Sequence, residues 1–217
     1  MDSDAQKYWN VYYQSFKEVS PSPFCSYVMH NFLDVKDTVL ELGCGNGRDG
    51  LSLAQNCTHY QGVDVSEEAI HQASLLFETQ GLQAEKYELL VNDFSSVTRP
   101  TTALGRVIVY SRFSLHADSE AAQQGLFNRL NQTLHEGDLL LIEVRTIHDE
   151  LFGVGTNVDR NAYFSDHYRR FLDPEDFPAL LPNRLKLLTK LVERGFAPYA
   201  GADPKIMRLF IEVIDND

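Results

Sequence analysis

The stretch from Thr38 to Gly50, TVLELGCGNGRDG, constrains the fold more than any other part of the chain. An apolar run, Thr38–Leu42, predicts a short buried strand, and Asp49–Gln55 predicts a helix. Between them glycine stands at every second position, where the missing Cβ permits left-handed dihedrals and a close approach to the backbone. The turn is therefore either a tight structural connection or a cradle for a cofactor.

The elements that follow alternate between strand and helix. Apolar runs predict strands at Tyr60–Val65, Glu88–Val91, Arg106–Tyr110, Leu139–Val144 and Ile206–Ile214. Helices are predicted at 66–79, with Ser66 as N-cap, at 119–134, and in LPNRLKLLTKLVERGF, where Gly195 ends the helix. Short apolar strands separated by helices are typical of an α/β fold, a doubly wound Rossmann-like sheet covered on both faces.

Composition limits the function classes. A chain of 217 residues suits one domain, and without a run of about 18 apolar residues or a signal peptide we expect a cytoplasmic protein. The formal net charge of -12 opposes nucleic acids and anionic membranes, so a small-molecule partner is favoured. The three cysteines and seven histidines show no metal-ligand spacing, and we expect no metal.

The spacing within the glycine turn separates two classes of cofactor. A pyrophosphate-binding fingerprint needs its third glycine at position 48, which is Arg48, so a dehydrogenase is disfavoured. The pattern E-x-G-x-G-x-G suits a ligand with an amino acid head and no phosphate. The carboxylate of Glu41 can pair with a positive charge on such a ligand. Asp64 ends the second predicted strand, where a carboxylate can accept both ribose hydroxyls. Asp93 ends the third, as a cap or as a contact to the adenine.

These motifs, VLELGCGNGRD, GVDVSEEAI and VNDF, resemble those of class I S-adenosylmethionine-dependent methyltransferases, from about Lys36 to the end of the chain. The resemblance implies seven strands, the last antiparallel. It places the glycines at the methionine end, Asp64 at the ribose, and Asn92, Asp93 and Phe94 at the adenine. The full set expected to bind S-adenosylmethionine is Tyr8, Tyr13, Glu41, Gly43, Gly45, Gly47, Arg48, Asp64, Val65, Asn92, Asp93, Phe94 and Ser111.

Residues 1–35 hold an aromatic cluster, Tyr8-Trp9-Asn10 with Tyr12-Tyr13, ahead of the first strand. It predicts either a helix packed on the core or a helical lid whose aromatic faces lie near the cationic sulfonium. Tyr8 and Tyr13 are the candidates for that contact.

The acceptor site is expected at the ends of the fourth and fifth strands and in residues 146–173, an irregular segment that predicts a cover. The candidate catalytic residues are Arg112, His116, Arg145 and His148, and the candidate substrate-binding residues are Tyr163, His167, Arg169 and Arg170. Arginines bind oxyacids, which need no base, whereas a hydroxyl acceptor would need a histidine as base. This combination favours a small anionic acceptor, phosphorylated or carboxylated.

YSRFSLHA, EVR, HYRRF and ADPKIMRLF also resemble segments of bacterial methyltransferases of capsule and O-antigen biosynthesis. That resemblance implies methyl transfer to an oxygen of a sugar or sugar phosphate. The alternatives are an N-methyltransferase of a small natural product and a catalytically silent module that only binds S-adenosylmethionine.

Overall fold

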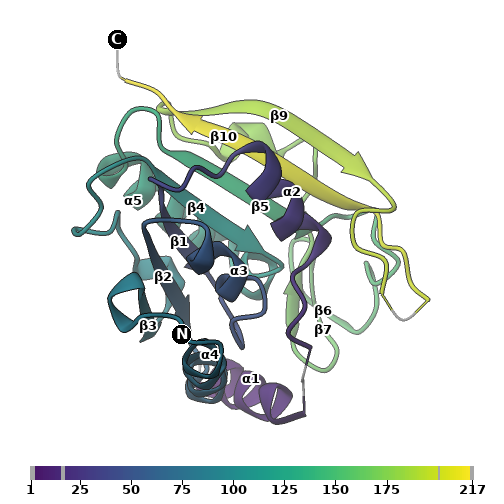
Figure 1. The fold of residues 1–217 in the computed structure, drawn as a ribbon. Coiled ribbons are helices and arrows are strands. Elements are labelled where there is room, and N and C mark those ends of the chain that lie inside the picture. The colour runs from purple at the N-terminus through teal and green to yellow at the C-terminus, as the bar shows by residue number, and fades with distance from the viewer. Residues whose placement is uncertain (1–2, 16–17, 200, 216–217) are drawn as a thin grey trace.

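The computed structural model describes residues 3–15, 18–199 and 201–215. Its main sheet has seven strands in the order β3-β2-β1-β4-β5-β10-β9 (Figure 1). Their bounds are β1 Thr38–Leu42, β2 His59–Asp64, β3 Tyr87–Val91, β4 Val107–Arg112, β5 Leu139–Arg145, β9 Leu185–Glu193 and β10 Ile206–Val213. β1 to β5 are parallel, and β10 runs antiparallel to both of its neighbours. The prediction of a doubly wound sheet of seven strands with an antiparallel last strand is confirmed.

Five α-helices accompany this sheet in the described residues: α1 Ser3–Ser15, α2 Pro23–Asn31, α3 Gly50–Gln55, α4 Glu67–Thr79 and α5 Glu120–Thr133. Single 3-10 turns are η1 Ala84–Lys86, η2 Phe94–Ser96, η3 Leu115–Ala117 and η4 Phe177–Leu180. Ser66 caps α4 as expected, because its side chain accepts a hydrogen bond from the backbone N–H of Ala69. No helix in the described parts of the chain is long and apolar enough to cross a membrane.

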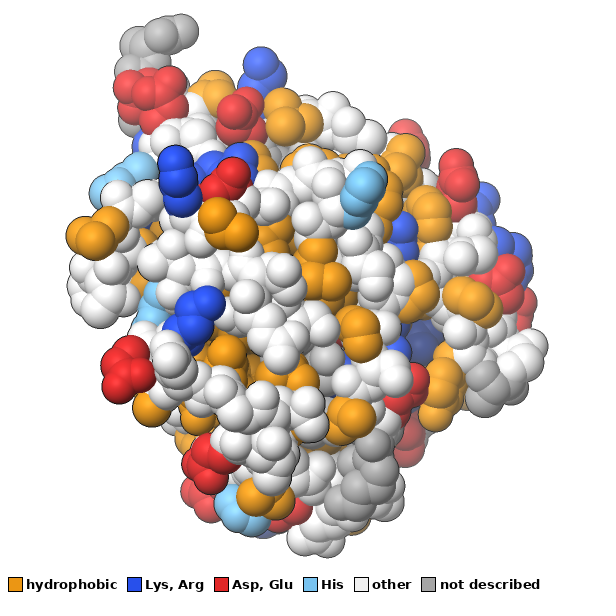
Figure 2. All heavy atoms as spheres, in the orientation of Figure 1, with side chains coloured by type: hydrophobic (Ala, Val, Ile, Leu, Met, Phe, Trp, Pro, Cys, Tyr) orange, Lys and Arg blue, Asp and Glu red, His pale blue; other side chains and the backbone are white. Residues whose placement is uncertain are grey.

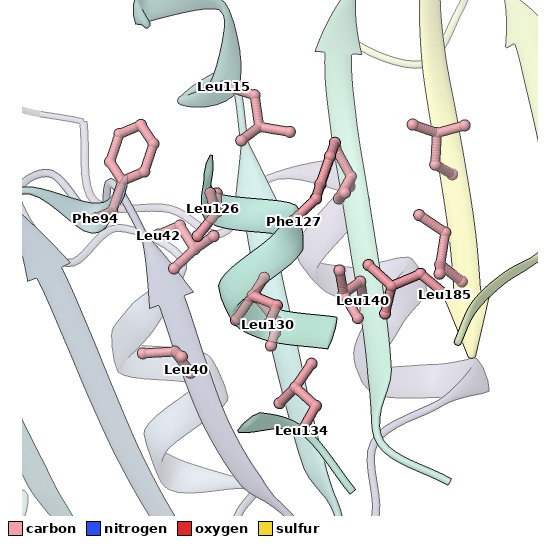
Figure 3. Packing of buried hydrophobic residues seen from close by; sticks show 14 of the residues in the cluster. Leu40, Leu42, Phe94, Leu115, Leu126, Phe127, Leu130, Leu134, Leu140 and Leu185 are labelled. Carbon is pink, nitrogen blue, oxygen red and sulfur yellow. The ribbon is translucent and has the colours of Figure 1, made fainter. Parts of the chain in front are cut away.

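The central strands are buried on both faces. Along β1, Leu40 and Leu42 belong to one apolar cluster and Val39 to the other, because successive side chains of a strand point to opposite faces. Figure 3 shows the first cluster, in which Leu126 and Leu130 of α5 pack against the leucines of β1. The opposite cluster draws on α2, α3 and α4. Two apolar layers therefore cover the sheet, one on each face.

Charged side chains are distributed differently from the apolar ones. On the face drawn in Figure 2, acidic and basic side chains are interspersed in small groups. Several pairs are mostly buried instead, among them Arg99 with Asp138 and Arg208 with Glu143. Buried pairs of this kind fix side-chain geometry more than surface pairs do.

One predicted helix is wrong: the leucine-rich segment before Gly195 forms β9, an edge strand paired with β10. The pairing skips Leu188, since Ile211 lies opposite Leu187 whereas Phe210 lies opposite Thr189. This bulge shifts the alternation by one residue, so the apolar positions 185, 187, 188, 191 and 192 acquire the spacing of a helix face. The seventh strand of the sheet lies in this segment.

The segment 146–173, which the sequence marked as irregular, contains a small antiparallel sheet. Its three strands are β6 Thr156–Asp159, β7 Ala162–Phe164 and β8 Tyr168–Arg170, in that order. They are too short to give a clear alternation in the sequence. The turn between β7 and β8, residues 165–167, reaches α1, as the contacts of Asp166 and His167 show below.

Candidate active site

A cavity of about 530 Å³ opens at the carboxyl ends of the parallel strands, next to the point where the strand order reverses between β1 and β4. In open α/β sheets this switch point is where ligands bind. The glycine turn and the end of β2 form one part of the wall. The ends of β4 and β5, helix α1 and the β7–β8 turn form the rest.

The glycines of the turn serve two different purposes. Gly45 has a φ of 54° and lies so close to the Tyr13 hydroxyl that a Cβ would collide with it. Gly47 has a φ of 78°, and a Cβ there would lie 2.8 Å from the Phe77 ring of α4. Gly45 therefore lines the cavity and makes room for the Tyr13 side chain, whereas Gly47 lets α4 pack against the turn and does not line the cavity.

Asp64 ends β2 and ties the glycine turn to the start of α4. Its Oδ2 accepts a hydrogen bond from the Gly45 N–H and its Oδ1 one from the Ser66 N–H, both at 2.9 Å. Burial raises the pKa of the Asp64 carboxyl. Each carboxylate oxygen has further acceptor capacity. Asp64 can therefore accept hydrogen bonds from two neighbouring ligand hydroxyls, as a ribose requires.

Glu41 also faces the cavity and is only 4% exposed. The Tyr60 hydroxyl donates a hydrogen bond of 2.6 Å to its Oε2. Burial, followed by the nearby Asp49 carboxylate, raises the pKa of Glu41 well above its usual value. A cationic ligand group beside Glu41 would stabilise the ionised form, so this carboxyl suits the amino group of an amino acid head.

Helix α1 presents four aromatic side chains, Tyr8, Trp9, Tyr12 and Tyr13, to the cavity. It lies beside α4 (Figure 1) and is attached to it through polar contacts. The Asn10 Oδ1 accepts a hydrogen bond of 2.7 Å from the Ser66 hydroxyl, and the Gln72 amide donates one of 2.6 Å to the Tyr13 carbonyl. Helix α1 thus forms one wall of the cavity and is tied to α4 by hydrogen bonds, and the role of residues 1–35 as a lid stays a prediction.

The β7–β8 turn meets α1 across the cavity mouth. The Tyr8 hydroxyl donates a hydrogen bond to Asp166 Oδ2 at 3.0 Å. The centroid of the His167 ring lies 4.5 Å from the centroid of the Tyr8 ring and 5.1 Å from that of the Trp9 ring. Burial and the hydrogen bond to Asp166 raise the pKa of Tyr8 to about 12. Burial, followed by the Arg169 guanidinium, lowers the pKa of His167. The contact therefore joins a neutral phenol, a carboxylate and a mostly neutral imidazole.

Two arginines converge on Phe113 at the end of β4. Phe113 has a φ of 54°, and its ring centroid lies 4.6 Å from the Arg112 guanidinium carbon and 5.2 Å from that of Arg145. Arg112 donates through Nε to Glu143 at 3.0 Å, and Arg145 through Nη1 to Asp149 at 2.6 Å. Among the described residues, neither guanidinium has another hydrogen-bond partner. Their remaining N–H groups are available at the cavity.

His116 of η3 lies in the same wall and is 5% exposed. Burial, followed by the Arg145 guanidinium, lowers its pKa well below the usual value for histidine. Its buried Nδ1 has no hydrogen-bond partner in the described part of the chain. The His116 ring is therefore neutral at neutral pH.

The structure gathers most of the predicted site residues around this one cavity. Those that line it are Tyr8, Tyr13, Glu41, Gly43, Gly45, Arg48, Asp64, Val65, Phe94, Arg112, His116, Arg145, His167 and Arg169. Those that do not are Gly47, Asn92, Asp93, Ser111, His148, Tyr163 and Arg170.

The residues outside the lining have other contacts. Asp93 caps η2 by accepting a hydrogen bond from the Ser95 N–H at 2.8 Å. Tyr163 packs on Phe152, with 5.3 Å between the centroids of the two rings. Arg170 follows Arg169 on β8, so alternation turns it away from the cavity and towards Glu120. Whether any of these residues contacts a ligand remains a prediction.

Several lining residues were missed by the sequence reasoning. Trp9 and Tyr12 lie four residues from Tyr13 and Tyr8, which is the helical spacing that places them on the same face. That signal was present in the sequence. Phe113, Asp166 and Tyr199 had no comparable signal, because they reach the cavity through a left-handed residue, a hairpin turn and the loop before β10.

Comparisons with known proteins agree with this fold. Residues 39–137 match the family model described as a methyltransferase domain, whereas no curated protein matches the chain. A solved S-adenosylmethionine-dependent methyltransferase from Methanosarcina mazei is 17% identical, with a TM-score of 0.73 over 87% of this chain and 98% of that one. One from Clostridium acetobutylicum is 18% identical, with a TM-score of 0.67 over 98% of each chain.

A third solved structure contains the cofactor. The magnesium protoporphyrin IX methyltransferase of Synechocystis, solved with bound S-adenosylmethionine, is 13% identical, with a TM-score of 0.58 over 98% of this chain and 85% of that one. At these identities the likeness to solved structures shows the fold alone. The match to a methyltransferase domain comes from the family model over residues 39–137. Residues 39–137 therefore match a methyltransferase domain, the whole chain has the fold of solved S-adenosylmethionine-dependent methyltransferases, and the protein is an enzyme whose cofactor is S-adenosylmethionine.

Proposed function

We propose that the enzyme transfers the methyl group to an oxygen of a small anionic acceptor, phosphorylated or carboxylated, such as a sugar acid or a sugar phosphate. The observation that carries this proposal is the pair Arg112 and Arg145. Both guanidinium groups stack on Phe113 beside the cofactor side of the cavity, and both keep donors free. Two such groups suit the oxygens of a carboxylate or phosphate, which arginine binds through a planar fork.

The carboxylates around these arginines support the same reading. Glu143 and Asp149 each take one N–H and hold the side chain in place without closing a two-point pair. Pairing also makes partial burial of the arginines tolerable. An acceptor oxyanion would then complete the hydrogen bonding of both guanidinium groups.

The size of the cavity favours a small acceptor. The same volume of about 530 Å³ must hold the cofactor and the acceptor together, because the glycine turn and the arginines line one continuous cavity. Direct displacement of the methyl group also requires the acceptor oxygen to lie in line with the sulfonium. A compact molecule with one anionic group and one reactive oxygen meets both conditions.

The protonation state of His116 bears on the chemistry. A carboxylate or phosphate oxygen is already ionised at neutral pH and needs no base. A hydroxyl acceptor would have to lose its proton, and the neutral His116 ring is placed to take it. The sulfonium of the bound cofactor supplies the electrophile, while the residues of the cavity orient the acceptor and exclude water.

An amine acceptor is the second candidate. Glu150 and Asp166 border the cavity, and four aromatic faces of α1 would favour a cation. Such an acceptor would make the protein an N-methyltransferase of a small natural product. Methylation of sugars in capsule or O-antigen synthesis would instead agree with the anionic reading, through the resemblance of the strand-end segments.

A screen for methyl uptake separates these candidates. The enzyme is incubated with methyl-labelled S-adenosylmethionine and matched pools of small phosphates, carboxylates and amines, and labelled products are separated by mass. We expect product from an anionic pool. In Arg145→Lys the half-saturating concentration of that acceptor should rise about tenfold. Product from amines alone would overturn the anionic acceptor, and the absence of cofactor binding would mean that the chain is no active methyltransferase.

A further inference from the structure

Glu143 lies between two arginines on three adjacent strands. The sheet register places Arg112 of β4 and Arg208 of β10 directly opposite Glu143 of β5. Arg112 Nε donates to Oε1 at 3.0 Å, and Arg208 Nε donates to Oε2 at 2.7 Å. Glu143 is 1% exposed and Arg208 is 6% exposed. One buried carboxylate thus serves two guanidinium groups, of which only Arg112 lines the cavity.

Arg208 is held firmly in this arrangement. Its guanidinium carbon lies 4.1 Å from the ring centroid of Phe196 and 5.1 Å from that of Phe24, and its Nη2 donates to the Phe196 carbonyl at 3.2 Å. β10 itself is a central strand, paired on both sides. Arg208 therefore cannot leave Oε2 without losing packing, a hydrogen bond and its charge partner.

Another arginine of the chain forms the two-point pair that Arg112 and Glu143 do not form. At the amino end of the sheet, Arg106 donates through Nε to Asp37 Oδ1 at 3.0 Å and through Nη2 to Asp37 Oδ2 at 2.6 Å. Such two-point pairs are the usual arrangement of arginine with a single carboxylate. Arg112 makes only one bond to Glu143, and the second oxygen of Glu143 accepts from Arg208 instead.

We infer that Arg208 is a positioning residue for acceptor binding. By occupying Oε2 of Glu143 it keeps Arg112 from closing a two-point pair, and so leaves the terminal nitrogens of Arg112 for the oxygens of the acceptor. This inference rests on the proposed anionic acceptor. It gives a role to the motif ADPKIMRLF, whose Arg208 does not line the cavity.

Calorimetric titration with inorganic phosphate, in the presence of saturating S-adenosylhomocysteine, tests this role. In Arg208→Met, which keeps an unbranched apolar side chain against the aromatic rings, we expect the dissociation constant for phosphate to rise about tenfold. In Arg208→Lys and Arg208→Gln an N–H donor for Oε2 remains, and we expect phosphate affinity within about threefold of the wild type. Cofactor affinity should stay unchanged in all three.

Arg106→Met is the matched control. It removes one arginine from a buried carboxylate at the opposite end of the sheet, so it should lower the melting temperature without changing phosphate affinity. Equal phosphate affinity in Arg208→Met and the wild type would overturn the inference, as would an equal loss in Arg208→Gln and Arg208→Met. A wild type that binds no phosphate would instead contradict the proposed acceptor class.

Should Arg208→Met fail to fold, the wild type supplies an independent measurement. Nitrogen-15 spectra of the arginine side chains, assigned with Arg112→Lys, would be followed during phosphate addition. We expect the terminal Nη signals of Arg112 to shift more than its Nε signal, which Glu143 holds. A shift confined to Nε would overturn the inference.

Discussion

The two sides of the cavity are built by different means. The side that we assign to the cofactor is made largely of backbone: a strand end, a glycine turn, and Asp64, which accepts hydrogen bonds from two backbone N–H groups. The acceptor side is made of side chains, whose guanidinium groups are held by carboxylates from other strands and loops. The first depends on the sheet and its apolar layers, and the second depends on a few ion pairs. Mutations should therefore act separately on the two sides.

Asp64→Ala should have the largest effect, and it should fall on the cofactor side. The change removes the acceptor for the ribose hydroxyls and leaves the N–H groups of Gly45 and Ser66 without their partner. Loss of one charge-assisted hydrogen bond costs about 1.5 to 3 kcal/mol, so affinity for S-adenosylmethionine should fall at least about tenfold. Titration calorimetry measures it. Unchanged affinity would mean that Asp64 serves the fold alone.

Arg112→Lys should come next and should fall on the acceptor side. Lysine keeps the charge but loses the planar fork and the stacking on Phe113, so the half-saturating concentration of the acceptor should rise about tenfold. The dissociation constant for S-adenosylhomocysteine, measured on the same preparation, should remain within about twofold. A loss of cofactor affinity as large as the loss of acceptor affinity would break the division between the two sides.

Glu41 should make cofactor binding depend on pH. Its raised pKa means that it still holds its proton at a pH where an ordinary glutamate has lost it. A bound amino group stabilises the carboxylate, so binding releases a proton and affinity should increase as the pH rises through the range in which Glu41 titrates. In Glu41→Gln this increase should disappear. A slope that persists in Glu41→Gln would assign it to another group.

Tyr8→Phe should have a smaller effect, at the contact that joins the two sides. It removes the hydrogen bond to Asp166 and keeps the ring packing on His167. We expect the mouth of the cavity to open more readily, with amide exchange in α1 and residues 165–167 faster by about two- to fivefold. Hydrogen exchange with bound cofactor should slow both segments together. Independent exchange of the two segments would show that they do not close as one unit.

His116 should leave the pH profile nearly unchanged around neutrality. A base must be unprotonated, and the lowered pKa keeps His116 in that form below the usual histidine value of about 6.5. With a hydroxyl acceptor, activity should therefore stay level as the pH falls through about 6.5 and decline only at lower pH. A half-maximal rate near the ordinary histidine pKa would place the titrating base elsewhere.

The wall that we assign to the cofactor could be located from the sequence because its signals are local. One strand and the turn after it contain Glu41, the glycines and, one strand later, Asp64 at a fixed distance along the chain. The acceptor side depends on register between distant strands. The alignment of Arg208 with Glu143, 65 residues away, follows from how β10 pairs with β5.

The β9 segment shows a second limit of sequence reasoning. A single bulged residue, Leu188, turned a strand's apolar pattern into one that reads as a helix. The hairpin of β7 and β8 shows a third limit. Arg169 and Arg170 are adjacent in the sequence, but on the strand Arg169 points to the cavity and Arg170 points towards Glu120. Both limits arise where side-chain direction depends on pairing that no short stretch of sequence specifies.

The central claim is that the acceptor side binds an anion whose oxygen receives the methyl group. Its most direct test is to incubate the enzyme with methyl-labelled S-adenosylmethionine and a mixture of small phosphates, carboxylates and amines, and then to identify the labelled compound. The account predicts an O-methylated anion whose formation is inhibited by added inorganic phosphate and is strongly reduced in Arg112→Lys. A labelled amine, formed at the same rate with and without phosphate and in Arg112→Lys, would contradict it.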